Sequence, residues 1–500
     1  MDGRREGSDV GGARTGSGTN DARDALRTHG DREASGTYGA GHGSVPHDAG
    51  GRSASDDARE GRISRRDFVR TTATATAGIA AARLAVPGPL TGRPARPARP
   101  SQDAIRIGVV GCGGRGTGAI RDTCRANDDV RIVALGDLFP DRIRRCRDAL
   151  AEAAEEDPSL ADKIDVSDDR VFTGFDAYER VLEADIDLVM LATPPGFRPL
   201  HLEAAVRAGK HIFTEKPVAV DAAGIRSVLA SYEAAREQGL AIVAGTQRRH
   251  DAGYGEVIRR IHDGAIGDVV GGQVYWNQGG LWHRDPDAEW TDAEWQIRNW
   301  LYFTWLSGDH IVEQHVHNID VANWVMDAHP VRAVAVGGRQ ARTAPEYGHI
   351  FDHFTVDFEY PNGVHIMSMA RQIDGAANFV GERFLGTDGR SNARDTIEGP
   401  NAFEFDRETV TNPYVQEHAD LVESIRAGRP LNELRRVAES TLTAIMGREA
   451  AYTGQEVTWD EILAADQELA PPDLDFGPLD VPPVPVPGRT TLNRRWSAAT

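Results

Sequence analysis

Hydrophobic positions divide the chain into segments of different character. Residues 1–60 consist mostly of glycine, serine, aspartate, arginine and alanine, with few bulky apolar side chains. Such a segment cannot bury enough apolar surface to offset the entropy lost on folding, so we expect disorder there. From residue 103 to about 246, short β-branched apolar runs alternate with stretches of helical periodicity. Beyond residue 247, longer runs with strand character follow a helix.

The region 103–246 predicts repeated strand-helix units. The expected strands are 104–110, 130–135, 170–172, 187–192, 211–214 and 241–245, and the helices between them include 199–208 and 222–238. Such units specify an α/β Rossmann domain with a doubly wound parallel sheet, whose ligand lies at the carboxyl ends of the strands.

The region 247–465 predicts an α+β domain. Its expected strands are 269–275, 331–336, 354–360, 364–369 and 379–384, and hairpin cues such as Pro361-Asn362-Gly363 separate several of them. We therefore expect a large, open, mostly antiparallel sheet. Stretches 414–428 and 431–454 have helical periodicity and are expected to pack as helices. The proline-rich tail, 466–500, is expected to run over the surface as extended chain.

Composition narrows the function. Lys and Arg number 56 against 76 Asp and Glu, which gives a formal charge of −20. This balance argues against nucleic acid and anionic membranes as partners, because phosphate affinity depends on clustered cations. Three cysteines, all between residues 112 and 146, argue against a disulfide framework or a cysteine metal cluster. Small-molecule chemistry is the default.

Residues 61–102 are typical of a twin-arginine export signal and linker. Ser64-Arg65-Arg66-Asp67-Phe68 precedes a mildly apolar run over residues 71–82 and a proline-rich stretch. The run is shorter than the roughly 20 apolar residues of a stable transmembrane helix. We expect export through the twin-arginine translocase, to the periplasm. The alternative is a chance arginine pair in a disordered tail.

A glycine-rich loop follows the first expected strand of the Rossmann region. In a G-x-G-x-x-G loop between strand and helix, the first glycine permits the tight turn and the second lets a pyrophosphate approach. The third packs helix on strand, with the helix N-terminus toward the anion. The predicted cofactor contacts here are Gly111, Gly113, Gly114, Arg115 and Gly116.

Asp137 ends the second expected strand, about 20 residues beyond Gly116, which is the spacing of the ribose-binding carboxylate. A carboxylate there accepts hydrogen bonds from the adenosine ribose and repels a 2′-phosphate, which favours NAD over NADP. The alternative is that Asp137 caps the helix that begins near Pro140.

Further motifs identify a resemblance. Glu215-Lys216-Pro217 follows the fifth expected strand, and Ala192-Thr193-Pro194-Pro195 follows the fourth. Together with the glycine loop, they resemble the Gfo/Idh/MocA family, the group of glucose-fructose oxidoreductase and inositol dehydrogenase, over about residues 103–465. The resemblance implies that Thr193, Pro194 and Glu215 belong to the cofactor site. It implies that Lys216 lies beside the nicotinamide and binds the substrate hydroxyl, and that the open sheet forms a homo-oligomer.

The second landmark of that family is D-x-x-x-H-x-x-D on a helix. We align it with Glu313, His317 and Asp320, which would share one helical face. The resemblance implies that His317 removes the hydroxyl proton, that Glu313 orients or charge-balances the imidazole, and that Asp320 contacts substrate. Glutamate replaces the family's first aspartate, which leaves the role of Glu313 open.

A metal site is the alternative for this region, because His310, Glu313, His315 and His317 lie close in sequence. The zincin pattern needs a pair of histidines four residues apart on one helix, bracketing the catalytic glutamate, and His310-x-x-Glu313-x-His315 does not have it. We therefore predict no metal.

The substrate is expected to be a carbohydrate. Seven of the nine tryptophans lie between Trp276 and Trp324, and flat aromatic faces suit the C–H surfaces of sugars. Core packing is the alternative for most of them. Arg248 follows the last Rossmann strand and is predicted to contact substrate.

Export and NAD together restrict the reaction. A dissociable NAD pool is not expected outside the cytoplasm, so the cofactor would stay bound and be regenerated in each cycle. A sugar or cyclitol oxidoreductase satisfies this, as does an NAD-dependent glycosidase that oxidises, eliminates, hydrates and reduces back. A non-catalytic carbohydrate-binding module is a third reading, which Lys216 and His317 argue against. We rank the oxidoreductase first.

Overall fold

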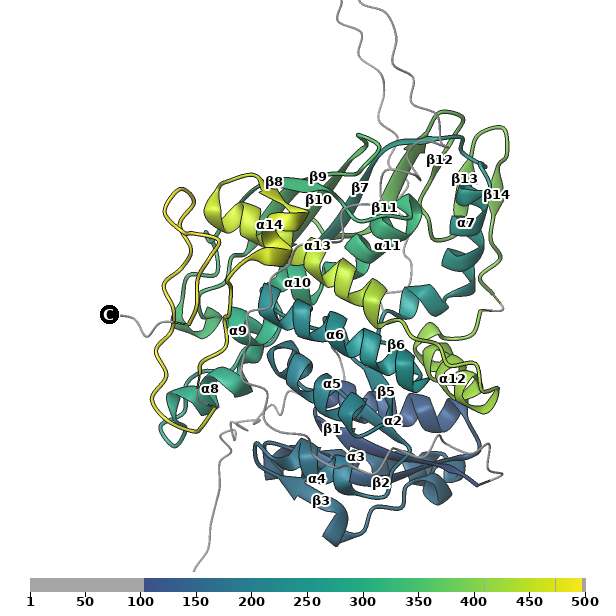
Figure 1. The fold of residues 1–500 in the computed structure, drawn as a ribbon, viewed down its shortest axis with the longest axis vertical. Helices are drawn as coiled ribbons and strands as arrows, with labels where there is room; N and C mark the ends of the chain where they lie inside the picture. Colours follow the sequence, from purple (N-terminus) through teal and green to yellow (C-terminus); the bar gives the residue numbers. More distant parts are fainter. Residues whose placement is uncertain (1–102, 409, 473, 497–500) are drawn as a thin grey trace, which may run out of the picture. The chain divides into compact units, whose positions relative to one another are not determined.

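The computed structural model describes residues 103–408, 410–472 and 474–496. The expectations for residues 1–60 and for the export signal at 61–102 lie outside these described residues. The described part contains a six-stranded sheet and a nine-stranded sheet (Figure 1). No helix within it is long and apolar enough to cross a membrane.

The first sheet is parallel throughout and has the order β3-β2-β1-β4-β5-β6. Its strands are β1 (Ile105–Val110), β2 (Val130–Asp137), β3 (Val171–Thr173), β4 (Leu188–Leu191), β5 (His211–Thr214) and β6 (Ile242–Ala244). Each coincides with an expected strand to within about two residues, so the predicted Rossmann sheet is confirmed.

Helices cover both faces of this sheet. One face carries α4 (Ala177–Glu183), α5 (Arg198–Arg207) and α6 (Ala222–Gln238), and the other α2 (Gly114–Ala126), α3 (Pro140–Glu156) and α12 (Pro413–Arg426). Helix α12 comes from the second half of the chain. Its Leu421 and Val422 join the apolar cluster that holds Ile107 of β1 and Ile120 of α2. Burial of these apolar surfaces fastens α12 to the cofactor half.

The second sheet has the order β14-β13-β12-β11-β7-β10-β9-β8-β15. Its long strands are β7 (Val269–Gln278), β8 (Arg332–Gly338), β9 (His353–Glu359), β10 (His365–Gln372) and β11 (Phe379–Gly386), and its short ones β12 (Arg390–Ser391), β13 (Thr396–Glu398), β14 (Phe403–Glu404) and β15 (Val457–Thr458). Only β7 and β10 pair in parallel, so the predicted mostly antiparallel sheet is confirmed.

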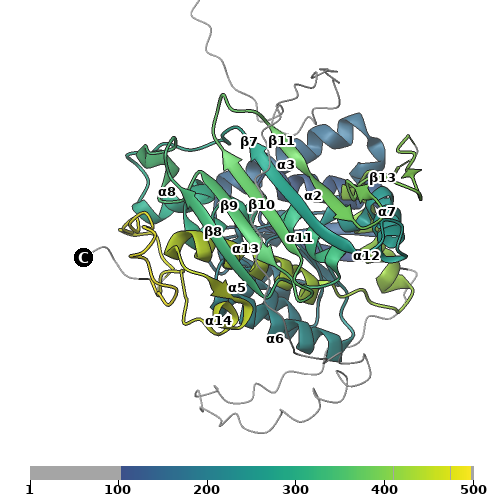
Figure 2. The same ribbon diagram turned by 90° about the horizontal axis from the view of Figure 1, so that it is seen from above.

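The two faces of this sheet differ. The inner face packs against α11 (Val316–Met326) and α13 (Leu434–Thr453), and its buried positions include Val274, Val356 and Phe384. No described helix covers the outer face, which is turned to the viewer in Figure 2. Two outward valines there, Val334 and Val336, are 52% and 70% exposed.

Several shorter helical segments complete the described part. They include α7 (Ala252–His262), α8 (Asp292–Arg298), η6 (Trp300–Tyr302), α9 (Thr304–Ser307), α10 (His310–Glu313) and α14 (Trp459–Ala464). Beyond α14, residues 466–472 and 474–496 form no helix or long strand and run beside α8 (Figure 1).

Candidate active site

The glycine loop follows β1 and leads into α2. Gly111 has a φ of +100°, and a side chain on Gly116 would lie 1.9 Å from the Gly111 carbonyl oxygen, so the fold itself requires both glycines. At Gly113 and Gly114, by contrast, a Cβ would meet no described atom within 4 Å. The open space above these two residues fits the approach of a dinucleotide to the backbone.

Asp137 lies directly beneath this loop. Its Oδ2 accepts a hydrogen bond from the amide of Cys112 at 2.7 Å, and its Oδ1 accepts one from the amide of Phe139 at 2.9 Å. Burial raises the pKa of Asp137. Helix α3 begins at Pro140 with Phe139 at its N-cap, so Asp137 holds the preceding turn rather than the helix terminus. The contact of this carboxylate with a ribose stays a prediction.

Arg115 and Glu215, two predicted cofactor contacts, bind each other. The Arg115 Nε donates to Glu215 Oε1, and its Nη2 donates to Glu417 Oε1 of α12 at 2.8 Å. A side chain on Gly245 would lie 2.5 Å from the Glu215 carboxylate, which therefore has little room to turn. The two residues tie the glycine loop to the turn after β5, and their direct contact with a cofactor stays a prediction.

The turn after β4 is held by Arg198, a residue that the sequence did not single out. Its buried guanidinium donates to the carbonyls of Leu191, Thr193 and Glu215 and, at 3.1 Å, to Thr214 Oγ1. It therefore joins the turns after β4 and β5. An arginine at the start of a helix is normally an exposed surface charge, so the local sequence did not indicate this buried role.

The predicted residues Thr193 and Pro194 lie in the same turn. Thr193 Oγ1 is 3.1 Å from Nδ1 of His201 in α5, and Pro194 precedes the short turn Pro195–Phe197. Burial lowers the pKa of His201 to about 3, so the ring is neutral. Both predicted residues thus lie at the carboxyl end of β4, beside the glycine loop that follows β1.

Lys216 and Glu313 form an ion pair. Lys216 Nζ donates to Glu313 Oε1 at 3.0 Å and to the Glu313 carbonyl oxygen at 2.5 Å. The two side chains are only 11% and 13% exposed. The expectation that Glu313 orients or charge-balances the His317 ring is therefore wrong, because the Glu313 carboxylate pairs with Lys216 instead.

The expected continuous helix over residues 313–320 is also wrong. Helix α10 ends at Glu313 and α11 begins at Val316, with His315 at its N-cap. The amide of His315 reaches back to the carbonyl of His310, and this wider turn interrupts the regular spacing. Glu313 and His317 thus come from two short helices joined by a turn.

Asp320 does not face the substrate region. Its Oδ2 accepts from Nε of Arg249 at 2.8 Å, and its Oδ1 accepts from Nη2 of Arg249 at 2.9 Å and from Ser440 at 2.7 Å. The Asp320 side chain is 2% exposed. Both carboxylate oxygens are occupied within the protein, so the expected substrate contact is corrected to a buried ion pair that anchors α11.

His317 has the properties of a neutral base. Its ring stacks on Trp276 with centroids 5.8 Å apart and an interplanar angle of 24°. Within the described residues no hydrogen bond engages either ring nitrogen. Burial holds the pKa of His317 well below the usual histidine range, and the positive charges of Lys216 and Arg248 lower it further. The imidazole is therefore neutral near pH 7 and free to accept a proton.

Arg248 lies against the same tryptophan as His317, and its contact with substrate stays a prediction. Its guanidinium carbon is 5.6 Å from the Tyr254 ring and 5.8 Å from the Trp276 ring. Its Nη1 donates to Glu382, a buried carboxylate that also accepts from Asn318 at 2.6 Å. Sequence reasoning missed Glu382, because it lies on β11 and a strand carboxylate is ordinarily exposed.

The histidines considered for a metal have other surroundings. His315 Nε2 is 2.8 Å from Ser368 Oγ, and the His310 ring packs edge-on against Phe354. Among the described residues, no group of three or more His, Cys, Asp and Glu side chains is arranged to hold a metal.

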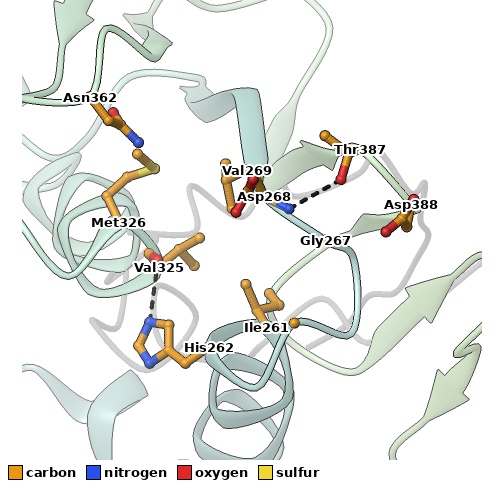
Figure 3. Close-up of a pocket in the computed structure, with 11 residues that line it drawn as sticks. Ile261, His262, Gly267, Asp268, Val269, Val325, Met326, Asn362, Thr387 and Asp388 are labelled. Atoms are coloured by element: carbon orange, nitrogen blue, oxygen red, sulfur yellow. Dashed lines mark hydrogen bonds between the residues drawn. The ribbon is translucent and has the colours of Figure 1, made fainter. Parts of the chain in front are cut away.

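A surface hollow of about 410 Å³ lies away from these residues. Its lining includes His262, Asp268, Met326 and Asp388, from the ends of α7 and α11 and the starts of β7 and the β11–β12 turn (Figure 3). His262 Nε2 lies within hydrogen-bond distance of the carbonyls of Trp324 and Val325, which occupies its polar edge. None of the predicted site residues lines this hollow.

Comparison with known proteins decides the family. Residues 105–246 match the oxidoreductase family with an NAD-binding Rossmann fold, and residues 254–390 match the GFO/IDH/MocA C-terminal domain. Together the two matches cover more than half of the chain. The chain belongs to the Gfo/Idh/MocA family. The resemblance inferred from the glycine loop and the Glu-Lys-Pro motif is confirmed, and residues 105–246 correspond to the NAD-binding Rossmann domain of this family.

Individual relatives in the Gfo/Idh/MocA family are distant. Inositol 2-dehydrogenase 3 from Saccharopolyspora erythraea is 28% identical over 263 residues, which cover 52% of this chain and 65% of that protein. A glycosyl hydrolase family 109 protein from the same organism is 27% identical over 229 residues, which cover 44% of this chain and 47% of that protein. The chain thus spans about half to two thirds of the length of these curated relatives.

A solved structure supports the fold. Scyllo-inositol dehydrogenase from Lactobacillus casei, with NAD(H) and scyllo-inositol bound, superposes with a TM-score of 0.53 at 19% identity. The match covers 71% of this chain and 99% of that chain. At this identity the likeness establishes the shared architecture of the two sheets.

Proposed function

We propose that this protein is an NAD-dependent oxidoreductase that oxidises a ring hydroxyl of a sugar or cyclitol. The observation that carries the proposal is His317, a buried neutral imidazole without a hydrogen-bond partner among the described residues, close to the charged Lys216. A neutral base beside a fixed cation is what the removal of a hydroxyl proton requires.

The protein residues have separate tasks in this proposal. His317 accepts the hydroxyl proton, and Lys216 donates a hydrogen bond to the oxygen from which the proton leaves. The glycine loop, Asp137 and Thr193 hold the dinucleotide, with the Asp137 carboxylate favouring NAD over NADP. Bound NAD supplies the acceptor for the hydride of the carbinol carbon.

The charges of the site favour an uncharged substrate. Each nearby cation already faces a carboxylate, in the pairs Lys216–Glu313, Arg248–Glu382 and Arg249–Asp320. These three cations of the described part are therefore charge-balanced and offer no net positive charge to a carboxylate or phosphate. The Trp276 ring beside His317 offers an apolar platform for ring C–H groups. A neutral polyol fits both features, and the similarity to proteins named inositol 2-dehydrogenase supports a cyclitol.

We further propose export and retention of the cofactor. Ser64-Arg65-Arg66-Asp67-Phe68 would direct the folded protein through the twin-arginine translocase to the periplasm. NAD would then remain bound and be reoxidised by a second substrate. Lysine substitution of both Arg65 and Arg66 should leave the protein in the cytoplasm, and unchanged export of that variant would contradict the signal.

We propose a homo-oligomer assembled through the outer face of the large sheet. This face exposes Val334 and Val336, and exposed apolar patches of this kind typically mark contact surfaces. A Val334→Lys, Val336→Lys variant should shift the mass measured by light scattering toward that of one chain. An unchanged mass would place the contact elsewhere.

A glycosidase is the second candidate. The similarity to a glycosyl hydrolase family 109 protein favours it specifically, and an oxidation-elimination mechanism would use the same Lys216 and His317. No pair of catalytic carboxylates would be needed. Aglycone release without net reduction of the nicotinamide would be its signature.

The decisive experiment extracts and identifies the nucleotide of the purified protein, then follows absorbance near ~340 nm with free sugars, cyclitols and glycosides. Reduction that persists until a second substrate is added supports the oxidoreductase. Release of aglycone without net reduction supports the glycosidase. Lys216→Ala should abolish turnover in either case, while Lys210→Ala, whose Nζ binds the Ile186 carbonyl at 2.7 Å, serves as the matched control.

A further inference from the structure

The loops after β2, β3 and β4 are covered by residues from far along the chain. Phe139 follows β2, Phe175 follows β3 and Phe197 follows β4, and all three pack in one apolar cluster with residues of two later segments. These segments are 281–307, which contains α8 and α9, and the described part of 466–496. We call the two segments together the cover. Figure 1 shows the second of them, in yellow, running beside α8.

One side chain of the cover bridges to the cofactor half. Arg298, the last residue of α8, donates from Nη2 to Asp141 Oδ1 of α3 at 3.1 Å. Its guanidinium carbon lies 3.8 Å from the Phe139 ring and 5.0 Å from the Trp290 ring. A second bond, from Nε to Glu294 at 2.8 Å, fixes its orientation. The Arg298 side chain is 13% exposed, so this pair is largely shielded from water.

The tail closes the same area from another direction. The ring of Phe476 stacks on Phe139 with centroids 5.8 Å apart and contacts Phe175 at 5.1 Å. The neighbouring chain is fixed to α8, because the Gln296 side chain donates to the Leu479 carbonyl at 2.8 Å and the Ala293 amide donates to the Gly477 carbonyl at 3.1 Å. Phe476 is thus held over the loops after β2 and β3.

The contact at β4 is the tightest of the three. A side chain on Gly196 would lie 2.1 Å from the Trp305 carbonyl oxygen, so α9 lies directly against the turn after β4. The Trp305 ring also meets Phe197 edge-on at 6.0 Å and Trp496 of the tail at 6.3 Å. The two cover segments therefore support each other.

The position of the cover identifies what it encloses. In a doubly wound sheet the carboxylate that ends β2 receives the adenosine ribose, so adenosine lies over the β2 side of the sheet. Phe139 is two residues beyond that carboxylate, Asp137, and donates its amide to it. Lys216 follows β5, on the other side of the switch in strand order. On the loops after β2 and β3 the cover therefore lies over the adenosine half of the edge, and through α9 it also reaches the turn after β4, on the catalytic side of the switch.

We propose that the cover retains the dinucleotide by closing over its adenosine end, and that the Arg298–Asp141 pair is the contact that must break for release. This inference rests on the proposed NAD-dependent function. It gives the proposed retention of the cofactor a structural cause within this chain.

The test measures release directly. The full-length protein is loaded with NADH, excess NAD is added, and the loss of bound-NADH fluorescence gives the dissociation rate. Arg298→Ala removes a partly buried ion pair and a cation–aromatic contact, and we expect release about 10-fold faster or more. Phe476→Ala truncates a 39% exposed ring and should also accelerate release, without the folding risk of a buried substitution. The exchange Arg298→Asp with Asp141→Arg should restore part of the slow release.

The matched control is Arg260→Ala. Arg260 stacks on the Phe403 ring at 3.8 Å and binds Glu256, the same combination of contacts, at a site remote from the Rossmann loops. It should leave release unchanged. The proposed role of the cover would be overturned if the wild-type protein binds NADH and both Arg298→Ala and Phe476→Ala release it at the wild-type rate. Wild-type protein that binds no NADH at all would instead overturn the proposed function.

Discussion

Lys216 Nζ is held by both the side chain and the backbone of Glu313, at 3.0 and 2.5 Å. The two residues belong to different halves of the chain, one after the last-but-one Rossmann strand and the other at the end of α10. The ammonium group of the proposed active site is therefore positioned by a contact between the halves. The family alignment suggested a carboxylate for the histidine, whereas the structure gives that carboxylate to the lysine.

A Glu313→Gln substitution tests this contact. The amide can still accept through its oxygen, but a hydrogen bond between charged groups becomes a weaker one. Because such a bond contributes about 1.5–3 kcal/mol, kcat should fall about 10-fold or more. The measurement is steady-state turnover, with dinucleotide affinity as the control that should not change. Equal kcat in the two proteins would show that Glu313 does not position Lys216 for the reaction.

The acidic side of the pH–activity profile, its acid limb, tests whether His317 is neutral. Burial, Lys216 and Arg248 hold its pKa well below the usual histidine range, so a base at this position stays unprotonated at lower pH than an ordinary histidine. We expect kcat/KM to stay level from pH 8 down through about 6.5, the pKa of an unperturbed imidazole, and to fall only below it.

Arg248→Met provides the comparison for that profile. Loss of its positive charge removes one of the causes that lower the His317 pKa, so the acid limb should move to higher pH. His283→Asn, at a partly exposed histidine, should leave the limb where it is. A limb that stays in place in Arg248→Met would mean that His317 is not the group that titrates.

The raised pKa of His250 predicts a loss of folding stability at alkaline pH. Its ring nitrogens lie 2.5 Å from Asp420 and 3.3 Å from Glu433. Burial alone would lower its pKa, but the hydrogen bond to Asp420 and the nearby negative charge of Glu433 raise the pKa of His250 to about 9. Because the folded-state pKa lies above the unfolded value, the stabilisation is fully present below about pH 6.5 and is lost as pH rises through about 9.

Urea unfolding between pH 6 and 10 checks this expectation. The free energy of unfolding should drop by about 1–3 kcal/mol over that interval, and His250→Gln should be less stable at pH 6 and nearly flat above it. His262→Gln is the control, because its ring contacts only backbone carbonyls among the described residues. Parallel pH curves for wild type and His250→Gln would refute the assignment.

Features that depend on the local sequence pattern could be predicted well from the sequence. The strand, glycine and acidic positions from Ile105 to Asp137 form one continuous signal, because backbone conformation and cofactor chemistry both constrain it. The break before His317 escaped prediction because its cause is distant. At the break, the Gln314 side chain accepts a hydrogen bond from Gln372, and His315 Nε2 lies 2.8 Å from Ser368 Oγ, both on β10 and far along the chain.

The ion-pair partners of the charged residues could not be predicted, for the same reason. Arg248 and Glu382 are separated by 134 positions, and Arg115 and Glu417 by 302. Nothing in the local pattern around either carboxylate distinguishes it from a solvated one. Burial and pairing are properties of the assembled sheets, and they decided which predicted site residues face the substrate region and which, like Asp320, are occupied within the protein.

The Arg248–Glu382 pair offers the sharpest test of substrate charge. Glu382 is 1% exposed and neutralises Arg248 in the wild type, which is why we expect uncharged rings to be preferred over sugar acids. Glu382→Gln keeps the shape and the acceptor for Asn318 but leaves the arginine charge uncompensated. Specificity, measured as the ratio of kcat/KM for a uronate to that for the neutral sugar, should then rise about 10-fold, since one charge-assisted hydrogen bond is gained. Glu359→Gln, on strand β9 of the same sheet and paired with exposed Arg332, changes the same charge away from the site and should leave the ratio unaltered. A ratio unchanged in Glu382→Gln would show that Arg248 does not meet the substrate, and it would remove the charge-balance argument for a neutral polyol.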